Sequence, residues 1–387
     1  MKRKNLLFIS AFFPYPTAPN IATYNRQELL ALTDYYNIDA IVPIPWTHAL
    51  RHKGAPQEGT LGKINIKYPT YYYSPYILRN FYGLYYYYSI KKAVSELTAR
   101  KTYDIIYSSW LYPDAWVAAK IAKLLKLPLF VSVLGTDVNR LRDDTYLSRK
   151  AIELSEYATQ IKCVSDSLRA NLISIGCGQD KLSVLQNGMD KNVFRPMDKF
   201  SVRKELGIRI KDKVILFVGN LKKEKGLGEL CHAFSQLLNT HLLQDCRLVV
   251  IGGGGFRPLL EKLLAELNMS NKTEILGERP LEVIAQYMNA CDVLCLPSYS
   301  EGQPNVVMEA MACHTRVVAT SVGGTPDLDL GYGNIKLIPP KNVLELTAAL
   351  YEVLTDGVEC EQWYQFNSWA DNAAYLYKLF ESAKCEV

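Results

Sequence analysis

Histidine is scarce in this chain, and the spacings that usually hold a metal are missing. Its 387 residues include five histidines and nine cysteines. There is no H-E-x-x-H and no C-x-x-C, which excludes the common zinc motifs. Scattered cysteines of odd number also argue against a disulfide framework and fit a reducing compartment. We therefore expect no metal, no bound cofactor and a cytoplasmic location.

Long apolar runs and a strong charge bias are also absent. Without an apolar run of about 18 residues, no transmembrane helix is expected. A net charge of +5 is too mild to indicate a nucleic-acid-binding protein. The start, MKRKNLLFIS, mimics a signal peptide. Its apolar run is short and is followed by Pro14 and Pro16, so we interpret residues 5–12 as a buried strand.

Short apolar runs instead alternate with helical patterns along the whole chain. Helical patterns such as Asp114–Leu125 and Arg257–Leu267 separate the runs. This alternation predicts an α/β protein with doubly wound parallel sheets. The strands are expected at Leu6–Ser10, Asn37–Val42, Ile105–Ser108, Leu129–Leu134, Gln160–Val164, Leu182–Leu185, Val214–Val218, Arg247–Ile251, Thr273–Leu276, Val293–Leu296, Arg316–Ala319 and Ile335–Leu337.

The length predicts two domains, each with a Rossmann-like sheet. We place an N-terminal domain at residues 1–195 and a second at 196–365, because the strand count restarts at Val214. A final helix is expected at 368–382. Ligands of such sheets bind at the carboxyl ends of the strands, in a cleft that the two domains face.

Residues 300–328 carry the strongest chemical pattern. Glu301 and Glu309 flank Gly302 and Pro304, and an apolar helical run begins beside Pro304. We expect Pro304 to be the first helical residue, where its missing N–H costs nothing. The helix start would then attract phosphate and sugar oxygens, while Glu301 accepts hydrogen bonds from hydroxyls and Glu309 faces a ribose. The alternative is a plain strand–turn–helix unit with a capping glutamate.

A second pattern is VILFVGNLKKEKGLGEL, residues 214–230, in which a buried strand ends at a glycine. Lys225 precedes the next helix, where its ammonium group can pair with a diphosphate. A solvated basic loop is the alternative, because Lys222 and Lys223 are neighbours. The glycine run at 252–255 is a weak signal by itself.

Taken in order, these segments resemble the donor half of glycosyltransferase family 4, whose members are retaining enzymes with the GT-B fold. In this family the last helix, here about 366–387, packs on the first domain. Asn220 stands where the family usually has an arginine, so one charge of the phosphate clamp is missing. The resemblance implies that the donor is bound by Gly219, Asn220, Lys225, Gly277, Arg279, Glu301, Gly302, Pro304, Asn305, Val306 and Glu309.

The first half resembles the acceptor half of relatives that build cell-surface polysaccharides. Residues 12–27 match a loop over the donor phosphates, with Ile21 where a glycine is common. Asp137 could contact the attacking hydroxyl, or could stabilise an Asx turn or helix cap. The implied acceptor-binding residues are Arg26, Tyr112, Asp114, Thr136 and Asp137.

Tyrosines crowd into residues 68–88, which hold ten of the 26 in the chain, with lysines on both sides. Tyrosine suits a membrane–water interface, and basic residues attract anionic lipid. The Tyr68–Tyr88 region therefore predicts a peripheral membrane surface. Aromatic packing between helices and a carbohydrate-stacking face are the alternatives.

The resemblance implies metal-independent transfer of a hexosyl group from a UDP-sugar or GDP-sugar to a saccharide, with Glu301, Lys225 and Asp137 as the catalytic residues. We expect a lipid-linked acceptor, used in cell-surface polysaccharide synthesis on the cytoplasmic face of the membrane. Two alternatives remain. One is a sugar phosphorylase or nucleotide-sugar epimerase on the same fold. The other is a catalytically degenerate, membrane-associated binding protein.

Overall fold

The computed structural model describes residues 3–18, 21–51, 57–74, 78–141, 145–239, 243–358 and 360–382. Parts of three predictions lie outside these ranges: residues 19–20 of the 12–27 loop, 75–77 of the tyrosine segment and 383–387 of the C-terminal segment. The chain forms two compact units. Unit 1 consists of Met1–Gly188 with Asn367–Val387, and unit 2 consists of Met189–Phe366.

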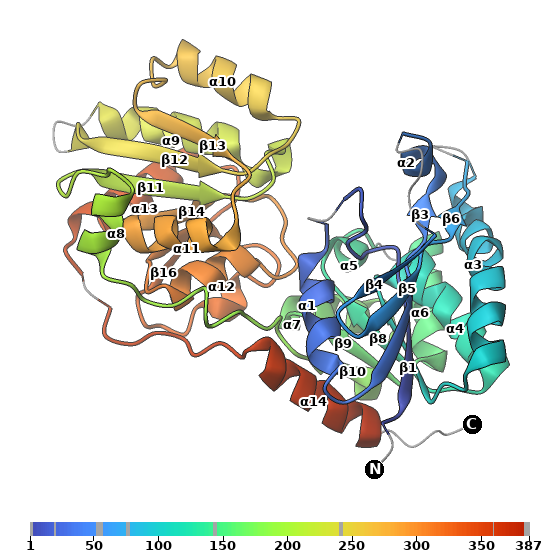
Figure 1. The fold of residues 1–387 in the computed structure, drawn as a ribbon. Helices are drawn as coiled ribbons and strands as arrows, with labels where there is room; N and C mark the ends of the chain where they lie inside the picture. Colours follow the sequence, from blue (N-terminus) through green and yellow to red (C-terminus); the bar gives the residue numbers. More distant parts are fainter. Residues whose placement is uncertain are drawn as a thin grey trace. The chain divides into compact units, whose positions relative to one another are not determined.

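Unit 1 is built on a mostly parallel sheet with the strand order β10-β9-β8-β7-β1-β2-β5-β4 (Figure 1). Only the β4–β5 pair in this sheet is antiparallel. A separate short pair joins β3 (Ile44–Pro45) to β6 (Thr70–Tyr71). The sheet strands are β1 (Asn5–Ile9), β2 (Asn37–Ile41), β4 (Glu58–Leu61), β5 (Ile64–Lys67), β7 (Ile105–Ser109), β8 (Leu129–Val133), β9 (Gln160–Cys163) and β10 (Leu182–Val184).

Helices cover both faces of this sheet, as the fully apolar strands predict. Along β1, Leu7 and Ile9 face one helical layer, and Leu6 and Phe8 face the other. The helices are α1 (Thr23–Leu32), α2 (Trp46–Arg51), α3 (Tyr82–Arg100), α4 (Trp116–Leu125), α5 (Thr136–Asn139), α6 (Tyr146–Tyr157), α7 (Asp166–Ser174) and α14 (Trp369–Ser382).

The C-terminal helix α14 belongs to unit 1, where it packs beside α1. Ala373, Leu376 and Phe380 of α14 are buried against the sheet, and the Phe380 ring lies 4.2 Å from that of Phe130. The chain thus returns to its first unit after completing the second.

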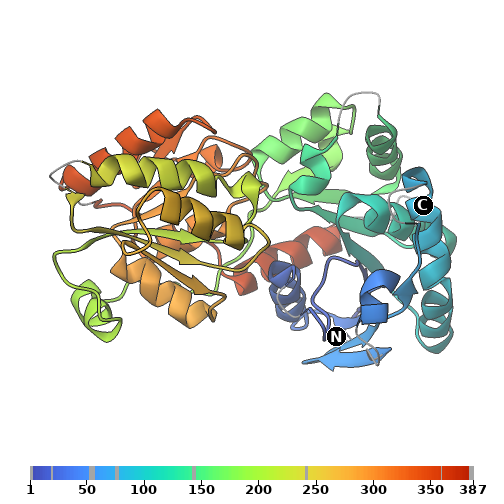
Figure 2. The ribbon, with the colours of Figure 1, turned by 90° about the horizontal axis from the view of Figure 1, so that it is seen from above.

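Unit 2 is a parallel sheet with the order β13-β12-β11-β14-β15-β16. Helices α9 and α13 pack together on one face, and α11 with α8 and α12 on the other (Figure 2). The elements are β11 (Lys213–Val218), β12 (Cys246–Ile251), β13 (Thr273–Gly277), β14 (Val293–Leu296), β15 (Val317–Thr320), β16 (Ile335–Ile338), α8 (Lys199–Glu205), α9 (Leu227–Leu238), α10 (Arg257–Glu266), α11 (Leu281–Ala290), α12 (Asn305–Ala312) and α13 (Val343–Thr355).

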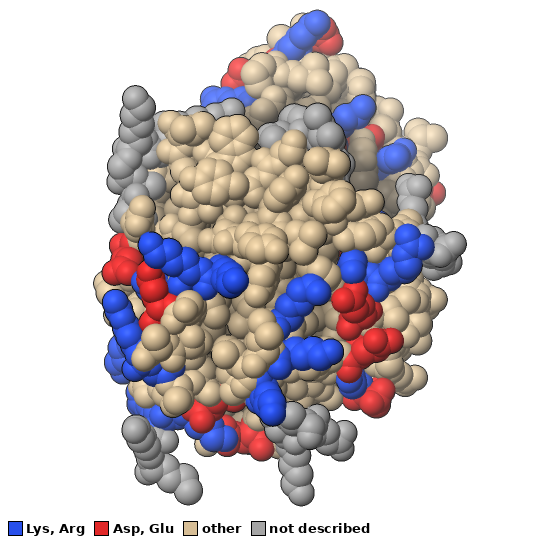
Figure 3. Space-filling model, turned by 90° about the vertical axis from the view of Figure 1, so that its right-hand side faces the viewer, with Lys and Arg blue, Asp and Glu red and all other residues tan. Residues whose placement is uncertain are grey.

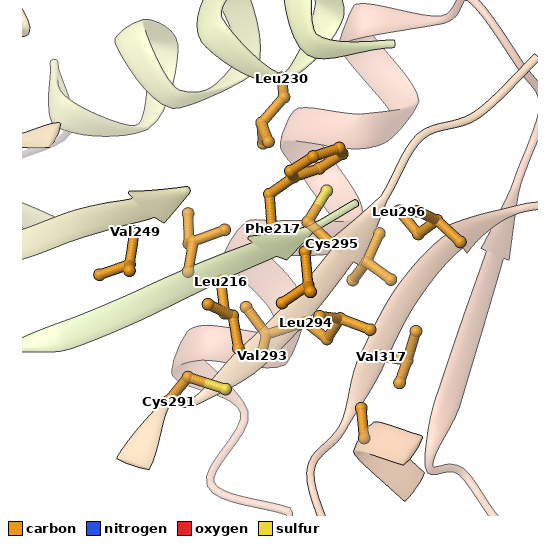
Figure 4. Close-up of a cluster of buried hydrophobic side chains, with 14 of the residues drawn as sticks. Leu216, Phe217, Leu230, Val249, Cys291, Val293, Leu294, Cys295, Leu296 and Val317 are labelled. Atoms are coloured by element: carbon orange, nitrogen blue, oxygen red, sulfur yellow. The ribbon is translucent and has the colours of Figure 1, made fainter. Parts of the chain in front are cut away.

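The core of unit 2 is a continuous apolar layer on each side of β11 and β14. Phe217 of β11 points toward Leu230 of α9, with Cys295 of β14 beside it (Figure 4). All three side chains are fully buried. This rigid sheet fixes the carboxyl ends of its strands, which is where the loops with the predicted donor residues begin.

Candidate nucleotide-sugar site

Glycines allow the backbones of four loops to lie in contact at the carboxyl edge of the unit 2 sheet. A Cβ atom on Gly252 would lie 1.9 Å from the carbonyl oxygen of Gly219, and one on Gly323 would lie 1.9 Å from that of Glu301. A Cβ atom on Gly226 would lie 2.0 Å from the Pro297 carbonyl oxygen. Because these backbones touch, no other residue fits at the three positions without moving a loop.

Main-chain hydrogen bonds hold the same loops in place. The Leu221 N–H donates to the Gly253 carbonyl at 2.8 Å, and the Gly252 N–H donates to the Gly277 carbonyl at 2.9 Å. The predicted donor residues Gly219 and Gly277 therefore lie on either side of the turn after β12. This edge is the place where doubly wound sheets bind ligands.

Lys225 and Glu301 form the charged centre of this edge. Lys225 ends a short turn before α9, and Glu301 lies in the loop between β14 and α12. The Lys225 Nζ atom is 2.6 Å from the Glu301 Oε1 atom, and the two side chains are 26% and 10% exposed. A ligand at this point meets an ammonium group suited to phosphate and a carboxylate suited to hydroxyls.

The start of α12 differs from the sequence prediction in one respect. The helix begins at Asn305, and Pro304 precedes it as the cap rather than as the first helical residue. The ψ of Pro304 is 85°, which is not helical. The Pro304 carbonyl accepts a hydrogen bond from the Val307 N–H at 2.9 Å, as expected of a residue that caps the first turn. The Gly302 carbonyl accepts a hydrogen bond from the Gly324 N–H at 2.8 Å, which joins this loop to the turn after β15.

Glu309 lies one turn into α12, partly exposed like Asn305 and Val306. Burial raises the pKa of the Glu309 carboxyl to about 7, because the charged form loses hydration there. Whether this carboxyl holds a ribose remains a prediction. Its position inside the helix, behind the Glu301 loop, is compatible with that role.

The two remaining predicted donor residues are exposed. Asn220 directly follows Gly219 at the end of β11. The Arg279 side chain donates to the neighbouring Glu278 carbonyl at 3.2 Å, in the loop after Gly277. The binding of the donor by Arg279, which the resemblance implies, stays a prediction.

Tyr299, which the sequence analysis did not single out, ties this edge together. Its N–H donates to the Glu224 carbonyl at 2.8 Å, and its hydroxyl donates to Glu229 at 2.6 Å. Tyr299 thereby joins the loop of Glu301 to the turn of Lys225. Only its position two residues before Glu301 could have indicated this.

In unit 1, Asp114 lies at the carboxyl end of the sheet and is buried. Its Oδ1 atom accepts from the Ser10 hydroxyl at 3.2 Å, from the Tyr86 hydroxyl at 3.0 Å and from the Ala11 N–H. Burial raises the pKa of the Asp114 carboxyl to about 7. Asp114 therefore fixes the turn after β1, where the predicted phosphate loop begins.

Asp137 accepts hydrogen bonds from the N–H groups of Leu111, Leu134 and Gly135 at 3.2, 3.1 and 2.8 Å. Burial raises its pKa. This is the turn-stabilising role that the sequence left as the alternative, and Asp137 as a whole residue is only 7% exposed, which leaves little surface for a substrate. Its predicted catalytic role is not tested by these contacts.

The other predicted acceptor residues have separate surroundings. The Tyr112 hydroxyl accepts from the Gly83 N–H at 2.8 Å and donates to the Asn80 carbonyl at 3.2 Å, so it is engaged with the start of α3. Thr136 is exposed at the start of α5. Arg26 lies half-buried on α1, with its Nε atom unpaired within the described part of the chain.

The tyrosine segment divides between core and surface. Tyr68, Tyr71 and Tyr86 are buried, while Tyr72 and Tyr88 are 63% and 69% exposed. Some tyrosines of this segment therefore pack in the core of unit 1, and others lie on its surface. Over the described residues, no helix is long and apolar enough to cross a bilayer, and no group of three or more metal-ligating side chains converges.

Known proteins are similar to this chain in sequence and in fold. Residues 198–368 match the family model "Glycosyl transferases group 1", and residues 48–193 match "Glycosyltransferase Family 4". An uncharacterized glycosyltransferase of Methanocaldococcus jannaschii is 30% identical over 66% of this chain and 67% of its own length. The putative teichuronic acid biosynthesis glycosyltransferase TuaC of Bacillus subtilis is 31% identical over 64% of this chain, which spans 60% of TuaC.

Among solved structures, Anabaena HepE in complex with UDP superposes with a TM-score of 0.71 at 20% identity, covering 97% of this chain and 95% of HepE. The two sheet units and their loops define a transferase of the GT-B class, a glycosyltransferase. The chain belongs to glycosyltransferase family 4.

Proposed function

We propose that this protein transfers a hexosyl group from a UDP-sugar or GDP-sugar to a saccharide, with retention of anomeric configuration and without a metal ion. The observation that carries the proposal is the contact between Lys225 and Glu301 at the carboxyl edge of unit 2. It places one cation for a diphosphate and one carboxylate for a sugar within a single ligand's reach.

The chemistry follows from these groups. Lys225, Asn220 and the N–H groups at the start of α12 stabilise the negative charge that develops on the leaving diphosphate. Glu301 accepts hydrogen bonds from the donor sugar, and Glu309 from the ribose. The acceptor hydroxyl attacks the anomeric carbon from the face that the diphosphate leaves. A phosphate oxygen takes the hydroxyl proton.

We further propose that the acceptor is a lipid-linked saccharide used in cell-surface polysaccharide synthesis, with the enzyme peripheral on the cytoplasmic face of the membrane. The likeness to TuaC, whose name refers to teichuronic acid biosynthesis, supports this choice. The exposed part of the tyrosine segment supports the membrane location, since tyrosine suits the membrane interface.

Thermal stabilisation by UDP, GDP and their sugars tests the donor site. A nucleotide at a hundred times its Kd stabilises a protein by about 2.7 kcal/mol. We expect a shift with one base that EDTA does not change. No shift with any nucleotide would contradict the proposal and favour a degenerate binding protein. Product formation without an acceptor, or dependence on free phosphate, would point to an epimerase or a phosphorylase.

A further inference from the structure

Helix α3 presents two different faces. Its inner face, with Gly83, Tyr86, Ile90 and Ala93, is buried in unit 1. Its outer face carries large side chains that no other part of the described chain covers. Leu84 and Tyr88 of this face, together with Tyr72, Leu78 and Phe81 from the segment before α3, form what we call the aromatic face; the five residues are between 43% and 69% exposed.

The aromatic face is continuous rather than scattered. Phe81, Leu84 and Tyr88 follow the spacing that places side chains along one side of a helix. The Tyr72 N–H donates to the Ser89 hydroxyl at 3.1 Å, which holds Tyr72 beside α3. Figure 3 shows the corresponding side of the molecule as a broad field without charged side chains, with lysines and arginines along its lower border and acidic side chains among them.

The basic border is partly supplied by the same helix. Lys91 and Lys92 are exposed one turn beyond Tyr88; the Lys92 side chain is 90% exposed, and its Nζ atom lies 4.0 Å from the Glu96 carboxylate. Aromatic and aliphatic side chains beside lysines suit an anionic bilayer surface. Lysine is depleted in protein–protein interfaces, which argues against a second protein as the occupant.

The inner face of α3 connects this surface to the predicted acceptor residues. The Tyr86 hydroxyl donates to Asp114, and the Gly83 N–H donates to Tyr112. Asp114 lies at the carboxyl edge of the sheet, so the aromatic face lies on the reverse side of a helix that contacts this edge. An α-helix with its side chains is only about 10 Å across, which a lipid-linked saccharide can span.

We propose that the aromatic face of α3 docks on an anionic lipid bilayer, and that α3 thereby presents a lipid-linked acceptor to the edge of unit 1 that carries Asp114. This inference rests on the proposed function for the identity of the acceptor. The docking itself is inferred from the exposed side chains of the aromatic face and from the lysines beside them.

Flotation with phosphatidylcholine vesicles, with or without about a third phosphatidylglycerol, tests the docking. We expect the full chain to bind only the anionic vesicles and to be released by salt. Leu84→Asp with Tyr88→Asp should abolish binding. Lys91→Ala with Lys92→Ala should weaken it about 30-fold, since each basic residue near the surface contributes roughly a factor of five. Leu259→Asp with Leu344→Asp in unit 2, at positions of similar exposure, should have no effect.

Three outcomes would overturn the proposal: no binding by the full chain, equal binding by the aromatic-face variants, or a dimer that those variants convert to monomer without any vesicle binding. Nucleotide-induced thermal shifts, measured on the same samples, report on the donor site independently. A retained shift with lost flotation shows that the variant is folded. Flotation without any nucleotide shift would instead refute the proposed function and leave the docking intact.

Discussion

Lys225 and Glu301 are 76 residues apart in the chain, yet the Nζ and Oε1 atoms of their side chains lie 2.6 Å apart. Each belongs to a loop that starts at the end of a different strand. Gly226 lets the two loops approach, because a Cβ at this position would collide with the Pro297 carbonyl, and Gly323 lets the turn after β15 approach the Glu301 carbonyl in the same way. The pair is thus a product of the sheet edge rather than of local sequence.

Replacing either member of the pair should lower turnover strongly. Lys225→Ala and Glu301→Ala should each reduce kcat about a hundredfold or more, because a preorganised charged donor or acceptor contributes roughly 3 kcal/mol in the transition state. Steady-state kinetics with the donor identified by thermal shift measures this. Lys222→Ala, an exposed lysine of the same loop, should stay near wild type. Near-normal turnover in both site variants would reject the assignment.

Restoring the usual cation of the clamp should tighten nucleotide binding. Asn220→Arg adds a charge beside Gly219, and a charge-assisted hydrogen bond to a diphosphate should lower the Kd about tenfold. Calorimetric titration with the nucleoside diphosphate measures the change. Asn271→Arg adds the same charge near the amino end of β13, at the opposite edge of the sheet, and should not alter the Kd. Equal effects of both variants would mean that only net charge matters.

Crowding at Gly323 should disrupt the site. Gly323 has φ +56°, and its Cβ would lie 1.9 Å from the Glu301 carbonyl oxygen. Gly323→Ala should therefore lower both the melting temperature and donor affinity. Gly331→Ala is the matched control, since Gly331 also has a positive φ, +77°, but faces open space. It should show only the backbone strain, about 1 kcal/mol. Identical losses in the two variants would contradict the packing argument.

Glu309 should make the protein less stable as the pH rises. Burial raises the pKa of Glu309 from 4.5 to about 7 in the folded protein. The folded state therefore holds a proton that the unfolded state has released. The resulting stability is complete below about pH 4.5 and is lost as the pH passes through 7. Glu309→Gln should thus gain in melting temperature relative to wild type between pH 5 and 8.

Melting curves of wild type, Glu309→Gln and the control Glu282→Gln over that range measure the effect. The control replaces an exposed glutamate of α11 and should follow the wild type. Asp114 titrates in the same direction, with a pKa of about 7, and is common to all three proteins. A constant difference between Glu309→Gln and wild type would show that the pKa of this carboxyl is not raised in the folded protein.

Much of the fold follows from local pattern. The predicted strands all occur, because runs such as Val214–Val218 are apolar on both faces and end at glycine or polar residues. The hairpin Glu58–Leu61 and Ile64–Lys67 was not predicted. The first strand has no buried residue, the second alternates between buried and more exposed positions, and the turn between them carries few apolar residues. Weakly patterned edge strands depend on the neighbour they pair with.

The candidate site was harder to predict than the fold. The resemblance indicated Lys225 and Glu301, but their direct contact depends on loops that meet only in three dimensions. Asp137 illustrates a different difficulty. A carboxylate at a strand end suggests a catalytic role, but the oxygens of this one accept hydrogen bonds from three main-chain N–H groups. The sequence also could not show which tyrosines of α3 are buried and which are exposed, since tyrosine occurs both in cores and on surfaces.

The position of α14 has a consequence for biosynthesis. Phe380 and its neighbours on α14 complete the core around Phe8, Tyr107 and Phe130, and they are translated only after the whole of unit 2. Unit 2 holds all its strands in one uninterrupted stretch and can fold as it leaves the ribosome. Unit 1 must wait, with the apolar face that α14 covers exposed, until the last helix emerges. The half of the protein that is made first is therefore the half that is finished last.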